Sequence, residues 1–231
     1  YNDCVVALRG GSEKDDSIIL CAGSGFNAAV MVEGKIKKVL NNYVPVNDQG
    51  GNALGGRALQ AVFDSHIGIR GETVLTQRLL DFFGYSNVDD LLLGRDHLTL
   101  NKEPRTSVSI LLQAAEENDH VALDVIYEFS KSVARYAACS LKKFDLVGKD
   151  CDVVLSGGIF KSENPLFIET ISAEIHCVSR QAKIVNAKYE PIVGAALLGL
   201  EAAGASKKSI TNCRKCAREF DLVRKDSFGK S

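Results

Sequence analysis

The sequence lacks any apolar run that approaches the ~20 residues of a membrane-spanning helix. It also lacks a signal peptide with a basic start and an apolar middle, so we expect a cytoplasmic protein without a membrane partner. The formal net charge is only -1, and basic residues are nowhere concentrated enough to imply nucleic acid as a partner. With 231 residues, 45% of them hydrophobic, the chain can bury the core of a large domain.

The clusters of cysteine and histidine that bind metals are also missing. Seven cysteines, an odd number, are scattered through apolar segments, which suits reduced thiols in a cytosolic protein. Only Cys213 and Cys216 form a C-x-x-C pair, and neither a second pair nor a nearby histidine accompanies them. The four histidines show no mutual pattern. We therefore expect no metal site built from side chains.

The most informative stretch that is present is SIILCAGSGFNA, residues 17–28. Its apolar first half predicts a buried strand, which ends in Gly23, Ser24 and Gly25, here called the GSG turn. Two glycines beside a hydroxyl group let backbone N–H groups approach a phosphate, and Ser24 can donate one more hydrogen bond. An ordinary turn between two strands has the same pattern, so both interpretations stay open at this point.

Strands and helices alternate along the rest of the chain, which predicts an α/β fold. Strands are expected over residues 17–21, 27–32, 152–155 and 183–185, and residues 35–44 are expected to form another strand and a loop. Helices are expected over residues 2–8, 53–66, 72–83, 87–93, 107–117, 119–144, 164–175 and 192–203. The segment 205–231 is charged and shows no clear period, so we expect it to be peripheral or partly disordered.

Two acidic residues have alternative interpretations. Asp3 can cap the first helix, or it can act as a general base at a strand-to-helix junction. Asp48 lies in residues 47–51, here called the NDQGG loop, where it can accept hydrogen bonds from a polyol or form an Asx-turn. Two further glycines, Gly157 and Gly158, follow a predicted strand, and Gly194 belongs to a helix face of very small residues that allows close approach.

In this order, the motifs NDxxxAL, GSGxN, NDQGG, LSGG and a small-residue helix resemble the BadF/BcrA-type ATPase and N-acetylglucosamine kinase family of the actin/hexokinase/Hsp70 superfamily. The match runs from Asn2 to Gly204. The resemblance implies an actin-like ATPase (ribonuclease H-like) lobe with a mixed sheet flanked by helices. Residues 1–15 would be the last helix of an N-terminal lobe, residues 16–204 the C-terminal lobe and residues 205–231 a charged tail. Because the chain opens at Tyr1 inside an element, we expect a preceding N-terminal portion.

By this resemblance, the protein phosphorylates an amino sugar such as N-acetylglucosamine with ATP and Mg²⁺. Asp3 would be the catalytic base, while Asn27 and Asp48 would contact the sugar. Nucleotide binding would be divided between two turns. The phosphates would lie on Gly23, Ser24 and Gly25, and the adenosine pocket would be lined by Gly157 and Gly158.

Departures from the family pattern keep other functions open. Phe26 replaces a small polar residue, and Gln49 stands where the family usually has a glutamate, so the sugar is not determined. The N-terminal Asp-Gly-Gly-Gly-Thr hairpin is absent from these residues, so we do not expect them to catalyse transfer alone. The alternatives are an ATPase that activates a partner enzyme through a shared iron–sulfur cluster, and a non-catalytic sugar or nucleotide sensor. A homodimer also stays open.

Overall fold

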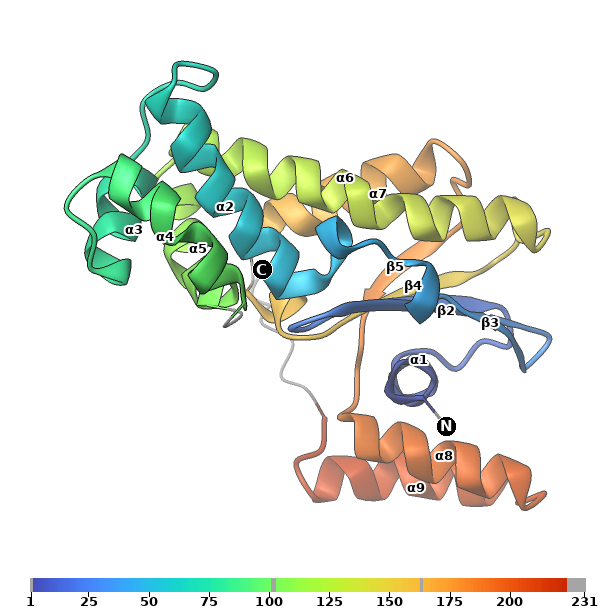
Figure 1. Cartoon of the computed structure of the whole chain (residues 1–231). Helices are drawn as coiled ribbons and strands as arrows, with labels where there is room; N and C mark the ends of the chain where they lie inside the picture. The colour runs from blue at the N-terminus through green and yellow to red at the C-terminus, as the bar shows by residue number, and fades with distance from the viewer. Residues whose placement is uncertain (1, 101–102, 163, 224–231) are drawn as a thin grey trace.

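The computed structural model describes residues 2–100, 103–162 and 164–223 of the chain (Figure 1). Within them lies a mixed five-stranded sheet in the order β3-β2-β1-β4-β5. The strands are β1 (Ser17–Ala22), β2 (Phe26–Val32), β3 (Lys35–Val39), β4 (Asp152–Ser156) and β5 (Lys183–Asn186). The first three strands pair antiparallel, and β4 and β5 add to β1 in parallel. The predicted α/β class with a mixed sheet is confirmed.

Helices cover both faces of the sheet (Figure 1). Along β1, Ile18 and Leu20 pack against the face that carries α2 (Gly50–His66), α6 (His120–Lys143) and α7 (Pro165–His176). Ile19 instead packs against α1 (Asp3–Gly11) on the opposite face. Successive side chains of a strand point to opposite faces of the sheet. The apolar residues of β1 therefore contribute to the hydrophobic cores on both faces.

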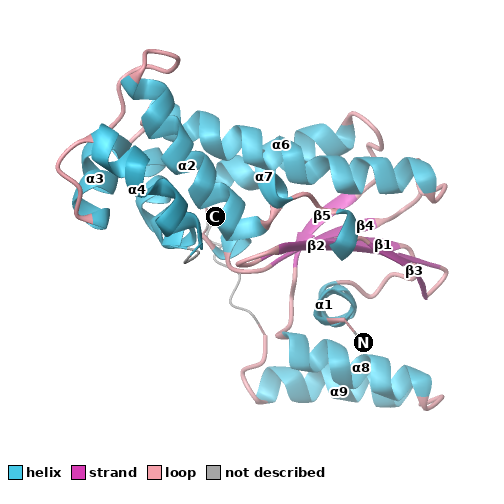
Figure 2. Cartoon of the chain, in the orientation of Figure 1, coloured by secondary structure: helices cyan, strands magenta, loops and turns pink. Residues whose placement is uncertain are grey.

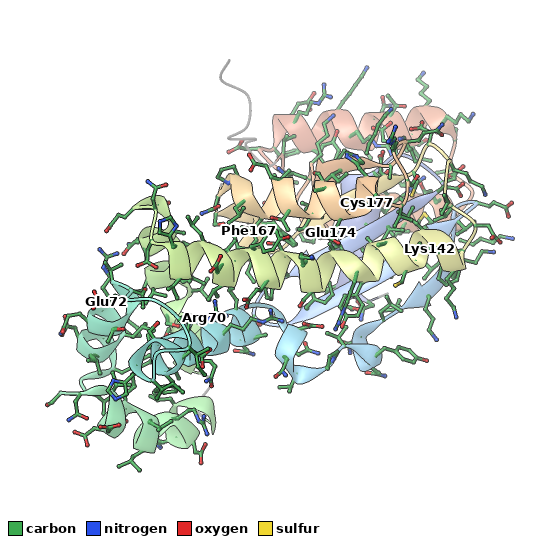
Figure 3. The ribbon with its side chains drawn as sticks, turned by 90° about the horizontal axis from the view of Figure 1, so that it is seen from above. Arg70, Glu72, Lys142, Phe167, Glu174 and Cys177 are labelled. Atoms are coloured by element: carbon green, nitrogen blue, oxygen red, sulfur yellow. The ribbon has the colours of Figure 1, made fainter. Side chains whose placement is uncertain are left out.

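The helices α6 and α7 run side by side over the sheet, as the view from above shows (Figure 3). Phe167 of α7 packs edge-to-face on Phe129 of α6, with ring centroids 6.4 Å apart. Lys131 and Glu174 join the same two helices by an ion pair of 3.4 Å. Aromatic pairs of this geometry add to the burial energy, so the two helices form a firm layer above the strands.

Three further helices, α3 (Leu75–Phe83), α4 (Val88–Leu100) and α5 (Val108–Glu116), gather beside α2 (Figure 2). The α2–α3 connection is tied to α6 because Arg70 donates to Glu128 at 2.9 Å. Gly84 ends α3 in the left-handed conformation, with φ 75°, as a glycine C-cap does.

Beneath the sheet, α1 packs against α8 (Pro191–Ala202) at very short range. A Cβ on Gly194 would lie 1.9 Å from the Val6 carbonyl oxygen and 2.9 Å from the Gly10 backbone nitrogen. Arg9 of α1 pairs with Glu201 of α8 at 2.5 Å. The small-residue face around Gly194, expected from the sequence to allow close approach, thus packs against the helix that carries Asp3.

The segment 205–231, expected to be peripheral or partly disordered, contains a helix that the sequence analysis did not predict. Residues 207–219 form a regular helix, α9 (Lys207–Glu219), which packs on α8 through Ile210, Cys213 and Ala217. These three residues recur at steps of three and four, so they form one apolar face among many cations. Residues 224–231 lie outside the described residues. In the described part of the chain, no helix has the combination of length and apolar character that crossing a membrane requires.

Candidate functional site

The GSG turn joins β1 to β2 at the tip of their hairpin. The strands are in register to its base, where Ala22 pairs with Phe26. The Gly23 N–H donates to the Gly25 carbonyl at 2.9 Å, which closes the turn. The N–H groups of Ser24 and Gly25 donate to no other described residue. The tip therefore offers two backbone donors and the exposed Ser24 hydroxyl to an incoming anion.

The first turn of α2 holds this tip from behind. Gly51 N–H donates to the Gly23 carbonyl at 2.8 Å, and Asn52 N–H donates to the Ser24 carbonyl at 3.1 Å. Gly50 makes the contact sterically feasible, since its φ is +53° and a Cβ there would lie 2.1 Å from the Gly25 carbonyl oxygen. The positive end of the α2 dipole is thus directed at the GSG turn, which favours a bound negative charge.

Gln49 of the NDQGG loop ties the hairpin to the preceding loop with both ends of its amide. Its Oε1 accepts from Phe26 N–H at 3.2 Å, and its Nε2 donates to the Val44 carbonyl at 3.0 Å. A glutamate has no Nε2 donor, so an ionised glutamate would face that carbonyl oxygen with a carboxylate. The amide of Gln49 therefore holds the loop in place.

Asp48 is buried in a network of side chains rather than open to solvent. Arg57 donates to its Oδ1 at 3.1 Å, while Arg135 and the Tyr136 hydroxyl donate to its Oδ2, the latter at 2.8 Å. Burial raises the pKa of Tyr136, which therefore stays a protonated donor to the carboxylate. The network anchors the NDQGG loop to α6. The role of Asp48 as a sugar ligand stays a prediction.

Asp3 lies in the first turn of α1, and Asn2 rather than Asp3 caps that helix. Asn2 Oδ1 accepts from Cys4 N–H at 2.9 Å and from Asn27 Nδ2 at 3.1 Å, which joins the start of α1 to the hairpin. The Asp3 carboxylate is exposed and has no hydrogen bond or ion pair to another described residue. The structure thus brings Asp3 and Asn27 to the same end of the hairpin as the GSG turn.

Gly157 and Gly158 lie at the same edge of the sheet, because Ser156 of β4 is in parallel register with Cys21 of β1. Gly157 has φ +102°, and a Cβ there would lie 2.3 Å from the Ala22 carbonyl oxygen. Gly158 has open space around it. Ligands of open α/β sheets bind outside the carboxyl ends of parallel strands, which is where both glycine turns meet.

A cavity of about 370 Å³ lies beyond Gly158, between the end of α5 and the start of α7. Ser162, Asn164 and Leu166 line one side, and Glu116 and Asn118 line the other. A larger, shallower depression of about 760 Å³ runs along β5 near Arg180, at the amino ends of the parallel strands. Ser162, which lines the first cavity, follows Gly158 by four residues in the chain, whereas the second cavity lies at the other ends of the strands.

Sequence reasoning identified the turns but missed the side chains that support them. Gln49 stood out only as a departure from the family, and the partners of Asp48 were not foreseen. Their positions in the sequence carry no signal, because Arg135 lies 87 residues from Asp48. No group of three or more histidine, cysteine or acidic side chains in the described residues could hold a metal ion.

Comparison with known proteins places these features in a family. The model of the BadF/BadG/BcrA/BcrD ATPase family matches residues 1–199. An N-acetylmuramic acid/N-acetylglucosamine kinase from Clostridium acetobutylicum is 25% identical over 202 residues, which cover 85% of this chain and 65% of that protein. The chain thus spans slightly less than two thirds of the length of this relative.

Solved structures of sugar kinases share the fold. A ROK family glucokinase from Streptomyces griseus, in complex with glucose and AMPPNP, superposes with a TM-score of 0.54 at 18% identity and covers 85% of this chain and 66% of its own. A sugar-kinase candidate from Cytophaga hutchinsonii gives a TM-score of 0.56 at 17% identity, covering 86% and 64%. At these identities the likeness shows the actin-like fold.

Proposed function

The chain belongs to the BadF/BadG/BcrA/BcrD ATPase family, and on that basis we propose that it takes part in the ATP-dependent phosphorylation of an amino sugar such as N-acetylglucosamine. One observation carries the proposal: a turn with two unpartnered backbone N–H groups lies at the same end of the hairpin as the start of α1, which carries the exposed Asp3. Phosphoryl transfer needs positioning and charge stabilisation more than covalent help, and this end of the sheet offers both.

The GSG turn would hold the phosphates of the nucleotide. The N–H groups of Ser24 and Gly25 are unpartnered in the described structure, and the α2 dipole reinforces them. Gly157 and Gly158 would line the adenosine pocket, which extends into the cavity beside Asn164. Bound ATP would supply the γ-phosphoryl group, with Mg²⁺ carried on its phosphate oxygens, since magnesium in such sites is held largely by phosphates and water.

Asp3 would accept the proton of the sugar hydroxyl. A general base must reach the proton it abstracts and keep its lone pairs available. Because Asn2 supplies the helix cap, the Asp3 carboxylate is left exposed and unpaired among the described residues. Asn27 donates to Asn2, the residue before Asp3, and would help to orient the sugar. Asp48 would act on the sugar through the NDQGG loop that it anchors, in addition to the direct contact predicted above.

We also propose that residues 16–204 are the C-terminal lobe of a two-lobe kinase, with residues 1–15 as the last helix of the N-terminal lobe and residues 205–231 as an appendage. Two observations support this division. The family match ends at residue 199, before α9 begins, and the relative from Clostridium is longer than this chain. Activity is therefore best measured on the full-length protein, including any residues that precede Tyr1.

The test is ADP release from ATP-Mg²⁺ in the presence of N-acetylglucosamine, N-acetylmuramic acid, N-acetylmannosamine or glucose. Sugar-stimulated release should fall about 100-fold or more in Asp3→Asn, because a general base contributes a factor of that size. Asp15→Asn, an exposed carboxylate at the other end of β1, is the matched control and should keep full activity. ADP release that no sugar stimulates would contradict the kinase and favour an activating ATPase. Sugar binding without turnover would favour a sensor.

A further inference from the structure

Arg105 is an exposed cation at the GSG turn that sequence reasoning did not single out. It lies in the 3-10 helix η3 (Glu103–Ser107), which packs against α2. Arg105 Cβ lies 3.9 Å from the position that a Cβ on Gly51 would occupy, and Ser24 Cα lies 3.8 Å from that same position. Arg105 Cβ therefore lies beside the first turn of α2, which holds the tip of the hairpin from behind.

The Arg105 guanidinium has no carboxylate partner in the part of the chain that the structure describes. Other arginines of the surrounding helices are paired: Arg57 with Asp48 at 3.1 Å and Arg78 with Glu117 at 2.7 Å. An arginine with a long stem and no fixed partner is free to turn towards a ligand on the GSG turn. Its planar fork matches two oxygens of a phosphate group.

The position of Arg105 opposes the local electrostatics of the fold. Gly51 belongs to the first turn of α2, where the helix dipole presents its positive end. A cation beside that end is repelled, and Arg105 forms no ion pair with a described carboxylate that would compensate for it. Departures of this kind from local stability rules are concentrated at functional sites, where a bound anion removes the conflict.

We propose that Arg105 binds the phosphate chain of the nucleotide on the GSG turn and neutralises the charge of the transferred phosphoryl group; this inference rests on the proposed kinase function. In that transfer, the sugar oxygen bonds to the γ-phosphorus and the bond from that phosphorus to the β–γ bridging oxygen breaks. ADP leaves with the electron pair, and the hydroxyl proton passes to Asp3. Arg105 donates N–H groups to non-bridging oxygens, which supplies the charge that backbone amides lack.

Binding of ADP and ATP to the full-length protein, measured by calorimetry, tests this role without requiring turnover. Arg105→Ala should weaken ADP binding about 10- to 100-fold, as expected for the loss of a charge-assisted hydrogen bond. Arg105→Lys should fall between Arg105→Ala and the wild type, since it keeps the charge but loses the fork. The matched control is Arg180→Ala, an exposed arginine before β5 at the opposite edge of the sheet, which should bind ADP like the wild type.

Thermal unfolding without ligand separates this role from a structural one. Because Arg105 is repelled by the α2 dipole, the melting temperature of Arg105→Ala should equal or exceed that of the wild type. A lower melting temperature together with weaker binding would overturn the proposal in favour of a structural role. ADP binding unchanged in Arg105→Ala would also overturn it.

The kinase function and the role of Arg105 fail in different ways. Wild-type protein that binds ADP through Arg105 but transfers nothing to any sugar would contradict the kinase and leave the phosphate contact standing. Sugar-stimulated turnover that is equally fast in Arg105→Ala and in the wild type would support the kinase function and contradict the role of Arg105. Wild-type protein that binds neither ADP nor ATP would contradict both.

Discussion

At the scale of single residues, Gly50 shows how closely the β1–β2 hairpin packs against the first turn of α2. A side chain there would have to adopt φ +53° and would place its Cβ 2.1 Å from the Gly25 carbonyl oxygen. Gly50→Ala should therefore lower the free energy of unfolding by about 2 kcal/mol or more, and it should weaken nucleotide binding. Denaturant unfolding and ADP titration check the two effects.

Gly56 in the same helix is the control for Gly50. No neighbouring atom lies within 4 Å of the position that a Cβ on Gly56 would occupy, and its φ is ordinary for a helix. Gly56→Ala should raise the free energy of unfolding by about 0.5–1 kcal/mol, because alanine is the better helix former. Equal free energies of unfolding for the two variants would contradict the close contact between Gly50 and the Gly25 carbonyl oxygen.

Asp48→Asn tests the ion-pair network behind the loop. The substitution leaves Arg57 without its carboxylate and turns an amide towards the Tyr136 hydroxyl. The variant should lose about 1–3 kcal/mol of stability, which lowers the melting temperature by several degrees. Asp89→Asn, an exposed carboxylate on α4, should melt like the wild type. An unchanged melting temperature in Asp48→Asn with a raised sugar KM would mean that Asp48 serves the sugar alone.

Whether a residue's role could be predicted from the sequence depended on how close its partners lie along the chain. The GSG turn and Gly157 could be predicted because a glycine needed for close approach follows its strand directly. The partners of Asp48 could not, since Tyr136 reaches it across 88 residues and only the packed fold brings them together. Arg105 carried no sequence signal, because an isolated arginine between helices is usually a solvated surface residue.

At the scale of elements, the contact between α1 and α8 places Asp3 relative to the hairpin. Gly194→Ala would drive its Cβ to 1.9 Å from the Val6 carbonyl oxygen, so the two helices would have to separate. We expect a loss of about 2 kcal/mol or more in the free energy of unfolding and a lower kcat, as α1 shifts. Gly199→Ala, on α8 but with open space around it, should be neutral or slightly stabilising. A shared outcome for both variants would argue against close helix contact.

Most helices and strands could be predicted from periodicity, and the exceptions have physical reasons. Residues 35–44, expected to form a strand and a loop, divide at Val39, because the two asparagines that follow favour a turn and Pro45 cannot extend a ladder. The helix α9 was missed because its apolar face is narrow and cations surround it. Ile210 and Ala217 become buried only once α8 covers them.

At the scale of the whole molecule, the two-sided core should protect some cysteines and expose others. Burial raises the pKa of Cys151 to about 12 and that of Cys4 well above its ordinary value, so both stay protonated at pH 8. Since the thiolate is the reactive form, iodoacetamide at pH 8 should modify the exposed Cys139, Cys177 and Cys216 first. Peptide mass spectrometry measures the order in which the cysteines are modified. Cys151 modified as fast as Cys177 in native protein would contradict the packing described here.

The sheet itself brings the two glycine turns together. Parallel pairing of β1 with β4 aligns strands that lie more than a hundred residues apart in the chain, and their carboxyl ends meet at one edge. The order of motifs pointed to this arrangement, but the register between the strands depends on both apolar faces being covered at once. The whole fold thus brings the GSG turn and the turn of Gly157 and Gly158 to the same ends of the parallel strands.

The most direct test of the kinase account is the fate of the γ-phosphoryl group. Full-length protein is incubated with γ-labelled ATP, Mg²⁺ and N-acetylglucosamine or N-acetylmuramic acid, and the labelled products are separated. The account predicts that the label appears on the sugar, and that Asp3→Asn abolishes this product while ADP still binds. Label recovered only as inorganic phosphate, at the same rate with and without sugar, would contradict it.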